Sequence, residues 1–151
     1  MIRPARPADD TALRELDRAT WSWSVSPAPA SSASLDTEGM LVAEVDGEVA
    51  GYVALGHPTR LESNRHVLSL RGLAVAPAHQ GRGLGRALLE AALAAARERG
   101  ARRLTLRVLS TNPGARALYE ACGFTVEGVL RDEFLLDGRY VDDVLMARDL
   151  S

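Results

Sequence analysis

Two hydrophobic periodicities follow one another along the chain and predict a mixed α/β (α+β) domain. Alternation of apolar and polar side chains predicts strands at residues 40–45, 48–55, 67–75, 103–109, 124–136 and 140–146. A helical period predicts a helix that begins near residue 10, a second from about 83 to 99, and a third after residue 112. With a short extended lead-in at residues 2–5, the order is β-α-loop-β-β-β-α-β-α-β-β. We therefore expect one domain over residues 1–151, with a mostly antiparallel, mixed central sheet flanked by helices.

Turn and cap residues set the boundaries of these elements. Asp-Gly pairs at 46–47 and 137–138 predict tight hairpins, and Asn112 with the proline after it predicts the start of the third helix. The segment 22–34 is rich in Ser, Pro and Ala and predicts a loop or mobile flap. Asp9 and Asp10 are candidate caps of the first helix, and glycines 100 and 123 are candidate stops. The helical side chains predicted to face the core are Ala12, Leu13, Leu16 and Ala19, then Leu84, Ala87, Leu88, Ala91, Ala92 and Ala95, then Ala115, Leu118 and Cys122.

Composition and charge narrow the classes of function. The chain is 46% hydrophobic and 25% charged, as globular domains are, and its net charge of −2 gives no overall field for nucleic acid or an anionic membrane. All 18 basic residues are arginine, which excludes a Walker-type phosphate loop and a pyridoxal Schiff base. A single cysteine excludes an internal disulfide, and the spacing of the three histidines argues against a metal site. Because the first ten residues and the interrupted apolar stretch near 87–96 predict neither a signal peptide nor a membrane span, we expect a cytoplasmic protein.

A glycine-rich segment between a strand and a helix carries the strongest chemical signal. Residues 80–86 read QGRGLGR, and glycines at alternate positions let the backbone turn sharply and present several N–H groups in one direction. The helix N-terminus behind them adds the positive end of its dipole. The segment predicts a socket for a phosphate or diphosphate, with a tight turn that binds nothing as the alternative. The dinucleotide fingerprint G-x-G-x-x-G is not met, because Arg86 or Leu88 stands where its third glycine would be.

Two motifs in this order resemble the GNAT N-acetyltransferase superfamily. Q-x-x-G-x-G at Gln80, Gly83 and Gly85, preceded by the strand LRGLAV, is similar to its acyl-coenzyme A signature. Asn112 followed by A-x-x-L-Y-E-x-x-G-F, at residues 115–124, is similar to the second motif of that family. The resemblance covers residues 40–149, and the tail at 138–150 looks like that of small-molecule and amino-acid acetyltransferases.

The resemblance implies that acetyl-coenzyme A binds where the strands 67–75 and 103–109 part. Its diphosphate would lie on the amides of residues 80–86 and its pantetheine arm along residues 73–75, where Gly72 is compatible with a bulge. The residues that the resemblance assigns to this cofactor are Leu73, Ala74, Val75, Gln80, Gly81, Arg82, Gly83, Leu84, Gly85, Arg86, Asn112 and Ala115.

Tyr119 is the catalytic residue that the resemblance implies. A phenol, with a pKa of about 10, would act as general acid toward the leaving thiolate, whose thiol has a pKa of about 8.5. A tyrosine that only lies at the edge of the helix is the alternative.

The general base is not assigned, because Ser69 and Arg107 stand where many relatives have a glutamate. A water chain could lead to backbone carbonyls or to an acid on the C-terminal hairpin, or the amine could need no base; His66 is a weaker candidate. The acids of that hairpin are Asp132, Glu133, Asp142 and Asp143.

The predicted activity is transfer of an acetyl group from acetyl-coenzyme A to a primary amine of a small molecule, by direct attack in a ternary complex. Acetylation of a protein N-terminus or side chain is one alternative, and a non-catalytic acyl-coenzyme A-binding module is another. Arg71 and Arg107 would select an acceptor with a carboxylate or phosphate, or form surface ion pairs. Trp21 and Trp23 would wall the acceptor pocket, or one would pack in the core. The exposed C-terminal strand pair would allow a homodimer.

A basic cluster at the end of the second helix has two readings. It forms a solvated face, or it contacts the 3′-phosphate of the cofactor. Its members are Arg97, Arg99, Arg102 and Arg103.

Overall fold

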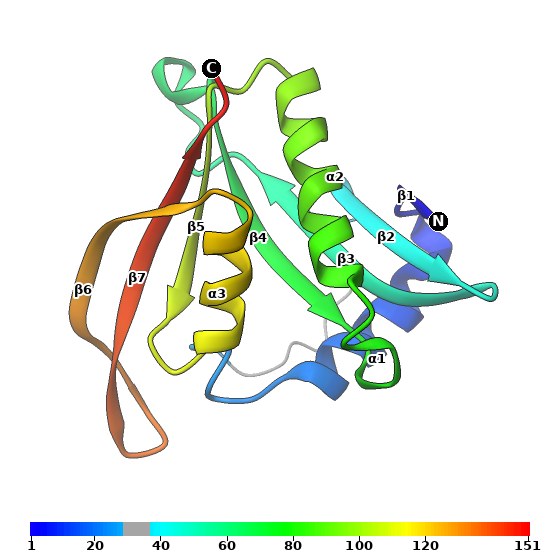
Figure 1. Ribbon diagram of the computed structural model, residues 1–151, viewed down its shortest axis with the longest axis horizontal. Helices are drawn as coiled ribbons and strands as arrows, with labels where there is room; N and C mark the ends of the chain where they lie inside the picture. The colour runs from blue at the N-terminus through cyan, green and yellow to red at the C-terminus, as the bar shows by residue number, and fades with distance from the viewer. Residues whose placement is uncertain (29–36) are drawn as a thin grey trace.

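The computed structural model describes residues 1–28 and 37–151 and has a seven-stranded sheet at its centre (Figure 1). The strands lie in the order β1-β2-β3-β4-β5-β7-β6, and every neighbouring pair is antiparallel except β4 with β5. The predicted fold class and element order are therefore confirmed. The bounds are β1 (Ile2–Pro4), α1 (Asp10–Thr20), β2 (Met40–Val45), β3 (Glu48–Gly56), β4 (Val67–Val75), α2 (Leu84–Glu98), β5 (Arg103–Leu109), α3 (Pro113–Ala121), β6 (Thr125–Leu136) and β7 (Arg139–Asp149).

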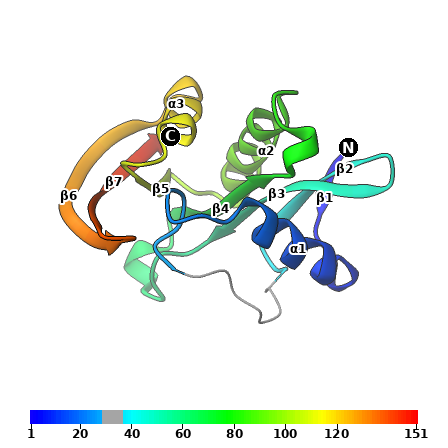
Figure 2. The same ribbon diagram turned by 90° about the horizontal axis from the view of Figure 1, so that it is seen from below.

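The helices divide between the two faces of the sheet. α2 and α3 lie on one face and α1 on the other, as Figure 2 shows. The main core fills the space between α2, α3 and the sheet, and a smaller cluster packs Leu13 of α1 against Met40 and Val42 of β2. Side chains of β2 and β3 alternate between these two cores, so these two strands carry apolar residues on both faces.

The buried stripe of α2 differs from the prediction. Leu84, Ala87, Ala91 and Ala95 are only partly buried. The helix presents its leucines to the sheet because a buried leucine removes more apolar surface from water than an alanine does. The fully covered side chains of α2 are Leu88, Leu89, Ala92, Leu93 and Ala96.

The first helix also departs from its prediction. Leu13 and Leu16 are buried as expected, whereas Ala19 is exposed and Ala12 only partly buried. Asp9 precedes the helix but forms no side-chain cap. Its carboxylate instead accepts hydrogen bonds from the guanidinium of Arg3, at 2.9 and 3.0 Å, and from the backbone N–H of residue 6 at 2.7 Å. This buried ion pair fixes β1 to the start of α1.

The hairpins form as predicted, and two irregularities shape the centre of the sheet. Asp46 and Gly47 have φ of 51° and 79°, which gives the turn between β2 and β3. β4 has a β-bulge at Arg71. Ala54 of β3 pairs with Gly72 and Leu55 of β3 pairs with Leu70, so Arg71 has no partner in β3. β4 pairs with β5 only at residues 67–69 and 103–105, so the two strands part beyond that point, as predicted. Of the predicted loop, residues 29–34 lie outside the described residues.

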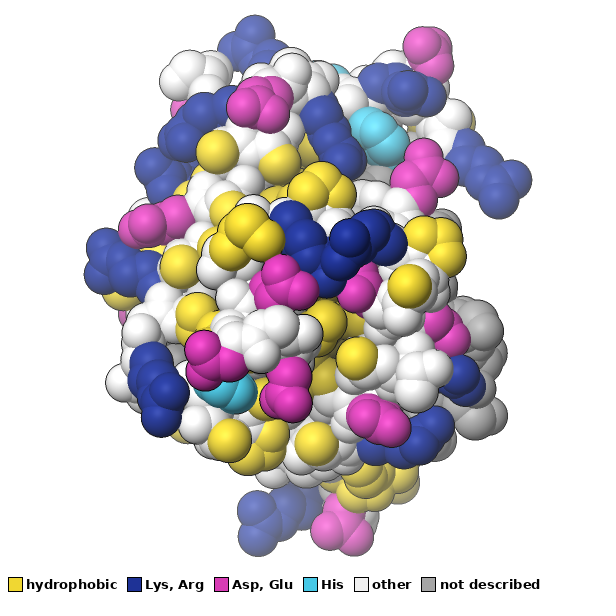
Figure 3. Space-filling view, turned by 90° about the vertical axis from the view of Figure 1, so that its right-hand side faces the viewer, with side chains coloured by type: hydrophobic (Ala, Val, Ile, Leu, Met, Phe, Trp, Pro, Cys, Tyr) yellow, Lys and Arg dark blue, Asp and Glu magenta, His cyan; other side chains and the backbone are white. Residues whose placement is uncertain are grey.

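Charges of both signs are interspersed on the face that Figure 3 shows, with no large area of one sign. None of the helices within the described residues has the length and apolar character needed to cross a bilayer.

Candidate functional site

A cavity of about 1040 Å³ lies at the point where β4 and β5 part. On the face of α2 and α3 it is lined by the glycine turn and the start of α3, and on the opposite face by α1 and the segment after it. The strand residues 70–75 and 107–108 line it between these two ends. The cavity therefore joins the two faces of the sheet through the gap.

The glycine turn has the geometry that its sequence predicts. Gly81 and Gly83 adopt φ of 77° and 82°, a backbone region that favours glycine. Gly85 lies close to α3, since a Cβ there would be 3.4 Å from Leu118 Cδ2. Within the described chain, the backbone N–H groups of residues 81–86 have no carbonyl partner, and those of the first turn of α2 point out of its N-terminus. The turn can therefore donate several hydrogen bonds to an anion.

Side chains around the turn complete this donor surface. Gln80 Nε2 donates to the carbonyl oxygen of Val75 at 3.0 Å, which ties the turn to the end of β4. His79 lines the cavity, and its buried Nδ1 has no hydrogen-bond partner among the described residues. Arg86 lines the cavity and pairs with Glu90 at 3.1 Å. All these polar groups fit a phosphate-bearing ligand.

Of the residues predicted to bind the cofactor, all but Arg82 line the cavity. Arg82 is exposed beside it. Asn112 caps α3 by accepting a hydrogen bond from the backbone N–H of Ala115 at 3.3 Å. The others that line the cavity are Leu73, Ala74, Val75, Gln80, Gly81, Gly83, Leu84, Gly85 and Arg86.

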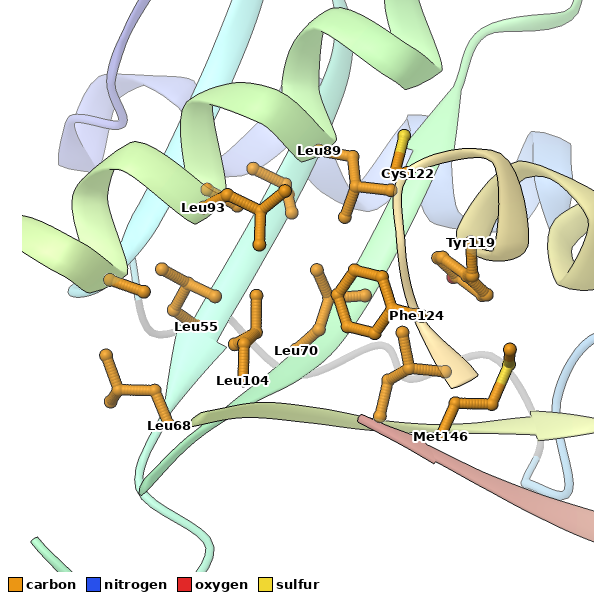
Figure 4. Packing of buried hydrophobic residues seen from close by; sticks show 14 of the residues in the cluster. Leu55, Leu68, Leu70, Leu89, Leu93, Leu104, Tyr119, Cys122, Phe124 and Met146 are labelled. Atoms are coloured by element: carbon orange, nitrogen blue, oxygen red, sulfur yellow. The ribbon is translucent and has the colours of Figure 1, made fainter. Parts of the chain in front are cut away.

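Tyr119 lines the same cavity but is more buried than its predicted position suggests. Its side chain is 7% exposed, and its ring lies 6.0 Å from that of Phe124 (Figure 4). Of the three residues predicted as the inward stripe, Cys122 is buried, whereas Ala115 and Leu118 are only partly buried because α3 turns its aromatic ring toward the core. Burial raises the pKa of Tyr119 to about 12. The hydroxyl has no hydrogen-bond partner within the described part of the chain and remains protonated at neutral pH.

Neither residue at the expected base positions is a base, and each has its own partner. Ser69 Oγ lies 2.8 Å from Thr105 Oγ1 where β4 and β5 still pair. Arg107 Nε donates to Oδ2 of the buried Asp143 at 2.5 Å, and the arginine also lines the cavity. The four acids of the C-terminal hairpin and His66 do not line the cavity. The backbone N–H of Asp132 donates a hydrogen bond to Asp142 Oδ1 at 2.9 Å.

The basic cluster lies away from the glycine turn. It stands at the C-terminal end of α2, about 20 Å along the helix from the turn, and does not line the cavity. Arg103 forms two hydrogen bonds with Glu127, at 2.8 and 2.9 Å. The solvated reading of the cluster fits this placement.

Sequence reasoning missed a hydrogen-bonded pair on the α1 face of the cavity. Tyr52 of β3 donates its hydroxyl to Asp17 Oδ1 of α1 at 2.5 Å, and both side chains line the cavity. Burial first, and the neighbouring carboxylate second, raise the pKa of Tyr52 well above its usual value. The helical period could have indicated this pair. Asp17 lies four positions after Leu13 and one after Leu16, so its carboxylate falls on the inward side of the helix.

Arg71 and Trp21 line the same end of the cavity. Arg71 Nη2 donates to the carbonyl oxygen of His57 at 2.5 Å. Trp21 Nε1 donates to the carbonyl oxygen of residue 28 at 2.7 Å, and its ring meets that of Trp23 edge-on at 4.9 Å. Trp21 therefore walls the pocket, and Trp23 is partly exposed behind it.

Comparisons with known proteins agree with this geometry. The model of the Acetyltransferase (GNAT) family matches residues 10–124. The chain is 32% identical over 112 residues to L-methionine sulfoximine/L-methionine sulfone acetyltransferase of Salmonella typhimurium, covering 74% of this chain and 65% of that protein. It is 37% identical over 112 residues to phosphinothricin N-acetyltransferase of Alcaligenes faecalis, covering 74% and 56%. The match thus spans less than two thirds of either relative. Among solved structures, yncA from Salmonella typhimurium with its cofactor acetyl-CoA superimposes with a TM-score of 0.83 at 27% identity, over 100% of this chain and 94% of that one.

Proposed function

Because the chain belongs to the GNAT acetyltransferase family, we propose that it transfers an acetyl group from acetyl-coenzyme A to the amine of a small molecule that carries a carboxylate. The observation that carries this proposal is the cavity itself, which is lined by the glycine turn with its unpaired backbone N–H groups, by the buried Tyr119 and by Arg71. The names of both relatives support the substrate class, since methionine sulfone and phosphinothricin are α-amino acids.

The residues present fit acetyl-coenzyme A. This molecule supplies an activated acetyl group, whose transfer to an amine releases a thiol. The unpaired N–H groups of residues 81–86 would hold its diphosphate, and the unpartnered His79 Nδ1 adds a polar atom beside them. Residues 73–75 line the gap with a strand edge that faces away from β3 and could pair with the pantetheine amides. Asn112 would contribute from the other wall.

Tyr119 would act on the leaving sulfur. Full proton transfer from a phenol with a pKa of about 12 to a thiolate whose thiol has a pKa of about 8.5 is unfavourable by about 5 kcal/mol. We therefore assign to Tyr119 a hydrogen bond to the sulfur that strengthens as negative charge develops there. The neutral amine forms the new N–C bond as the C–S bond breaks, the nitrogen loses one proton and the released thiol gains one, so Tyr119 ends the reaction protonated. The hydroxyl is available for this bond, since it has no other partner among the described residues.

Arg71 would bind the carboxylate of the acceptor. Strand alternation places Gly56 on the same face of β3 as Tyr52. The side chain of Arg71 lies over Gly56, and its Nε is 2.7 Å from the position that a Cβ on Gly56 would occupy. The arginine therefore lies on the α1 face. Among the described residues, its only hydrogen bond is from Nη2 to the carbonyl oxygen of residue 57. Arg107 is a weaker candidate, because the carboxylate of Asp143 already neutralises it.

The test is thiol release from acetyl-coenzyme A with a panel of amines. We expect turnover with α-amino acids, and slower turnover with the matching amines that lack the carboxylate. Arg71→Ala should remove this preference, whereas Arg139→Ala, at an exposed arginine outside the cavity, should keep it. Release with short peptides alone would indicate a protein acetyltransferase. Binding of coenzyme A without release with any amine would indicate a non-catalytic module and contradict the proposal.

A further inference from the structure

Asp17 is the one carboxylate among the described residues that line the cavity. It extends from α1, and its Oδ1 accepts the hydroxyl hydrogen bond of Tyr52. The acids predicted as bases all lie elsewhere, so they do not compete for a cation in this space. The cavity is thus lined by one carboxylate and by the guanidinium of Arg71. These two groups make it complementary to a molecule that carries both a positive and a negative charge.

Tyr52 places this carboxylate next to the gap in the sheet. The tyrosine crosses from β3 onto Gly72 of β4, and its hydroxyl is 3.2 Å from where a Cβ on Gly72 would stand. The absence of a side chain at Gly72 therefore makes room for the ring. Because the hydroxyl is the donor and Asp17 the acceptor, the second carboxylate oxygen is left for another partner.

The acetyl donor and the acceptor would reach the gap from opposite faces of the sheet. The glycine turn opens on the face of α2 and α3, so a phosphate-bearing donor enters from there. The opposite face of the gap, which α1, Tyr52 and Trp21 line, is left for the acceptor. Asp17 is thus placed where the acceptor would arrive.

We propose that Asp17, held in position by Tyr52, binds the ammonium group of the acceptor. This inference rests on the proposed function and adds the anchor of the reacting nitrogen to it. Asp17 and Arg71 together would hold the two charges of an α-amino acid, and Tyr52 is a positioning residue that does not itself touch the acceptor.

The decisive experiment compares two ligands in two proteins, with coenzyme A bound. L-methionine sulfone carries the ammonium group, whereas 4-(methylsulfonyl)butanoate is the same molecule without it. In the wild type, calorimetry should show tighter binding of the amino acid. Asp17→Asn should weaken its binding about 10- to 100-fold, to the level of the analogue, and leave the affinity for the analogue unchanged. The Michaelis constant for the amine should rise in parallel, while that for acetyl-coenzyme A stays within twofold.

Matched variants separate binding from structure. Asp10→Asn is the same substitution on the same helix, outside the cavity, and should behave as the wild type. Asp17→Glu should restore part of the affinity. If Asp17→Asn does not fold, Tyr52→Phe keeps the ring over Gly72 and should raise the Michaelis constant for the amine more than it lowers kcat.

Three outcomes would overturn the inference. The first is an Asp17→Asn variant that still distinguishes the two ligands, and the second is a Tyr52→Phe variant with unchanged constants. Both would leave the proposed function intact if the wild type turns over. The third is a wild type that binds both ligands equally; thiol release with L-methionine sulfone then decides separately whether an α-amino acid is the acceptor.

Discussion

Replacing Tyr119 with phenylalanine removes one oxygen atom from the cavity and keeps the ring that packs near Phe124. Since the hydroxyl has no partner among the described residues, its loss should change the free energy of unfolding by less than about 0.5 kcal/mol at neutral pH. A hydrogen bond to a charged group contributes about 1.5–3 kcal/mol, so kcat should fall about 10- to 100-fold. The dissociation constant of coenzyme A should stay within twofold.

The raised pKa of Tyr119 gives this prediction a second part. Because burial keeps the phenol protonated to about pH 12, the ratio of wild-type to variant kcat should be constant from pH 7 to 10. The unfolded chain ionises this tyrosine at about pH 10, so the stability present below that pH is lost as the pH rises toward 12. The phenylalanine variant lacks this loss of about 3 kcal/mol and should resist alkaline unfolding better.

Thiol release, calorimetry with coenzyme A and denaturant unfolding together test Tyr119→Phe. Tyr140→Phe, at a side chain that is 68% exposed, is the matched control. A Tyr119→Phe enzyme with kcat within twofold of the wild type would refute the role of this hydroxyl. A variant that loses cofactor affinity but keeps kcat would show a binding residue instead.

Two further substitutions test the turn and the N-terminal ion pair. The Cβ of a Gly83→Ala variant would meet no atom within 4 Å, but the residue must keep a φ of 82°. Thermal unfolding should therefore show a loss of about 1–2 kcal/mol in the free energy of unfolding, and calorimetry should show weaker binding of coenzyme A. An unchanged melting temperature would contradict this prediction. The pKa of Asp9 is lowered to about 2, chiefly by the hydrogen bond from Arg3, so its stabilisation is present above about pH 4 and is lost as the pH falls toward 2. Urea unfolding of Asp9→Asn should therefore show about 2 kcal/mol less stability at pH 7 and little difference from the wild type at pH 2; equal stabilities at pH 7 would disprove it.

Local patterns in the sequence were sufficient to predict the elements. The Asp46-Gly47 turn, the glycines of residues 81–85 and the Asn112 cap each act within a few residues, so their geometry follows from the local chain. The parting of β4 and β5 was expected from family resemblance, and the pairing of only residues 67–69 with 103–105 confirms it.

Features that depend on packing between distant segments could not be predicted. The extra residue in β4 depends on how this strand pairs with β3, and the contact of Tyr52 with Asp17 joins residues 35 positions apart, so no local pattern encodes either feature. The burial of Tyr119 likewise depends on the rotation of α3 about its own axis against the sheet. The spacing of alanine and leucine along this short helix does not determine that rotation. The faces of α2 and α3 were therefore misplaced by about one position, although Leu88, Ala92 and Cys122 are buried as predicted and the helices themselves were correct.

The parting of β4 and β5 also creates two strand edges inside the sheet. Backbone groups at such edges are templates for pairing with a strand of another molecule, and proteins discourage this with charged side chains. Arg71 and Arg107 stand at the two sides of the parting, one on each strand. We therefore expect these two arginines to protect the ligand-free protein from self-association. Replacing both with valine should promote aggregation, and saturating coenzyme A should suppress it by covering the edges.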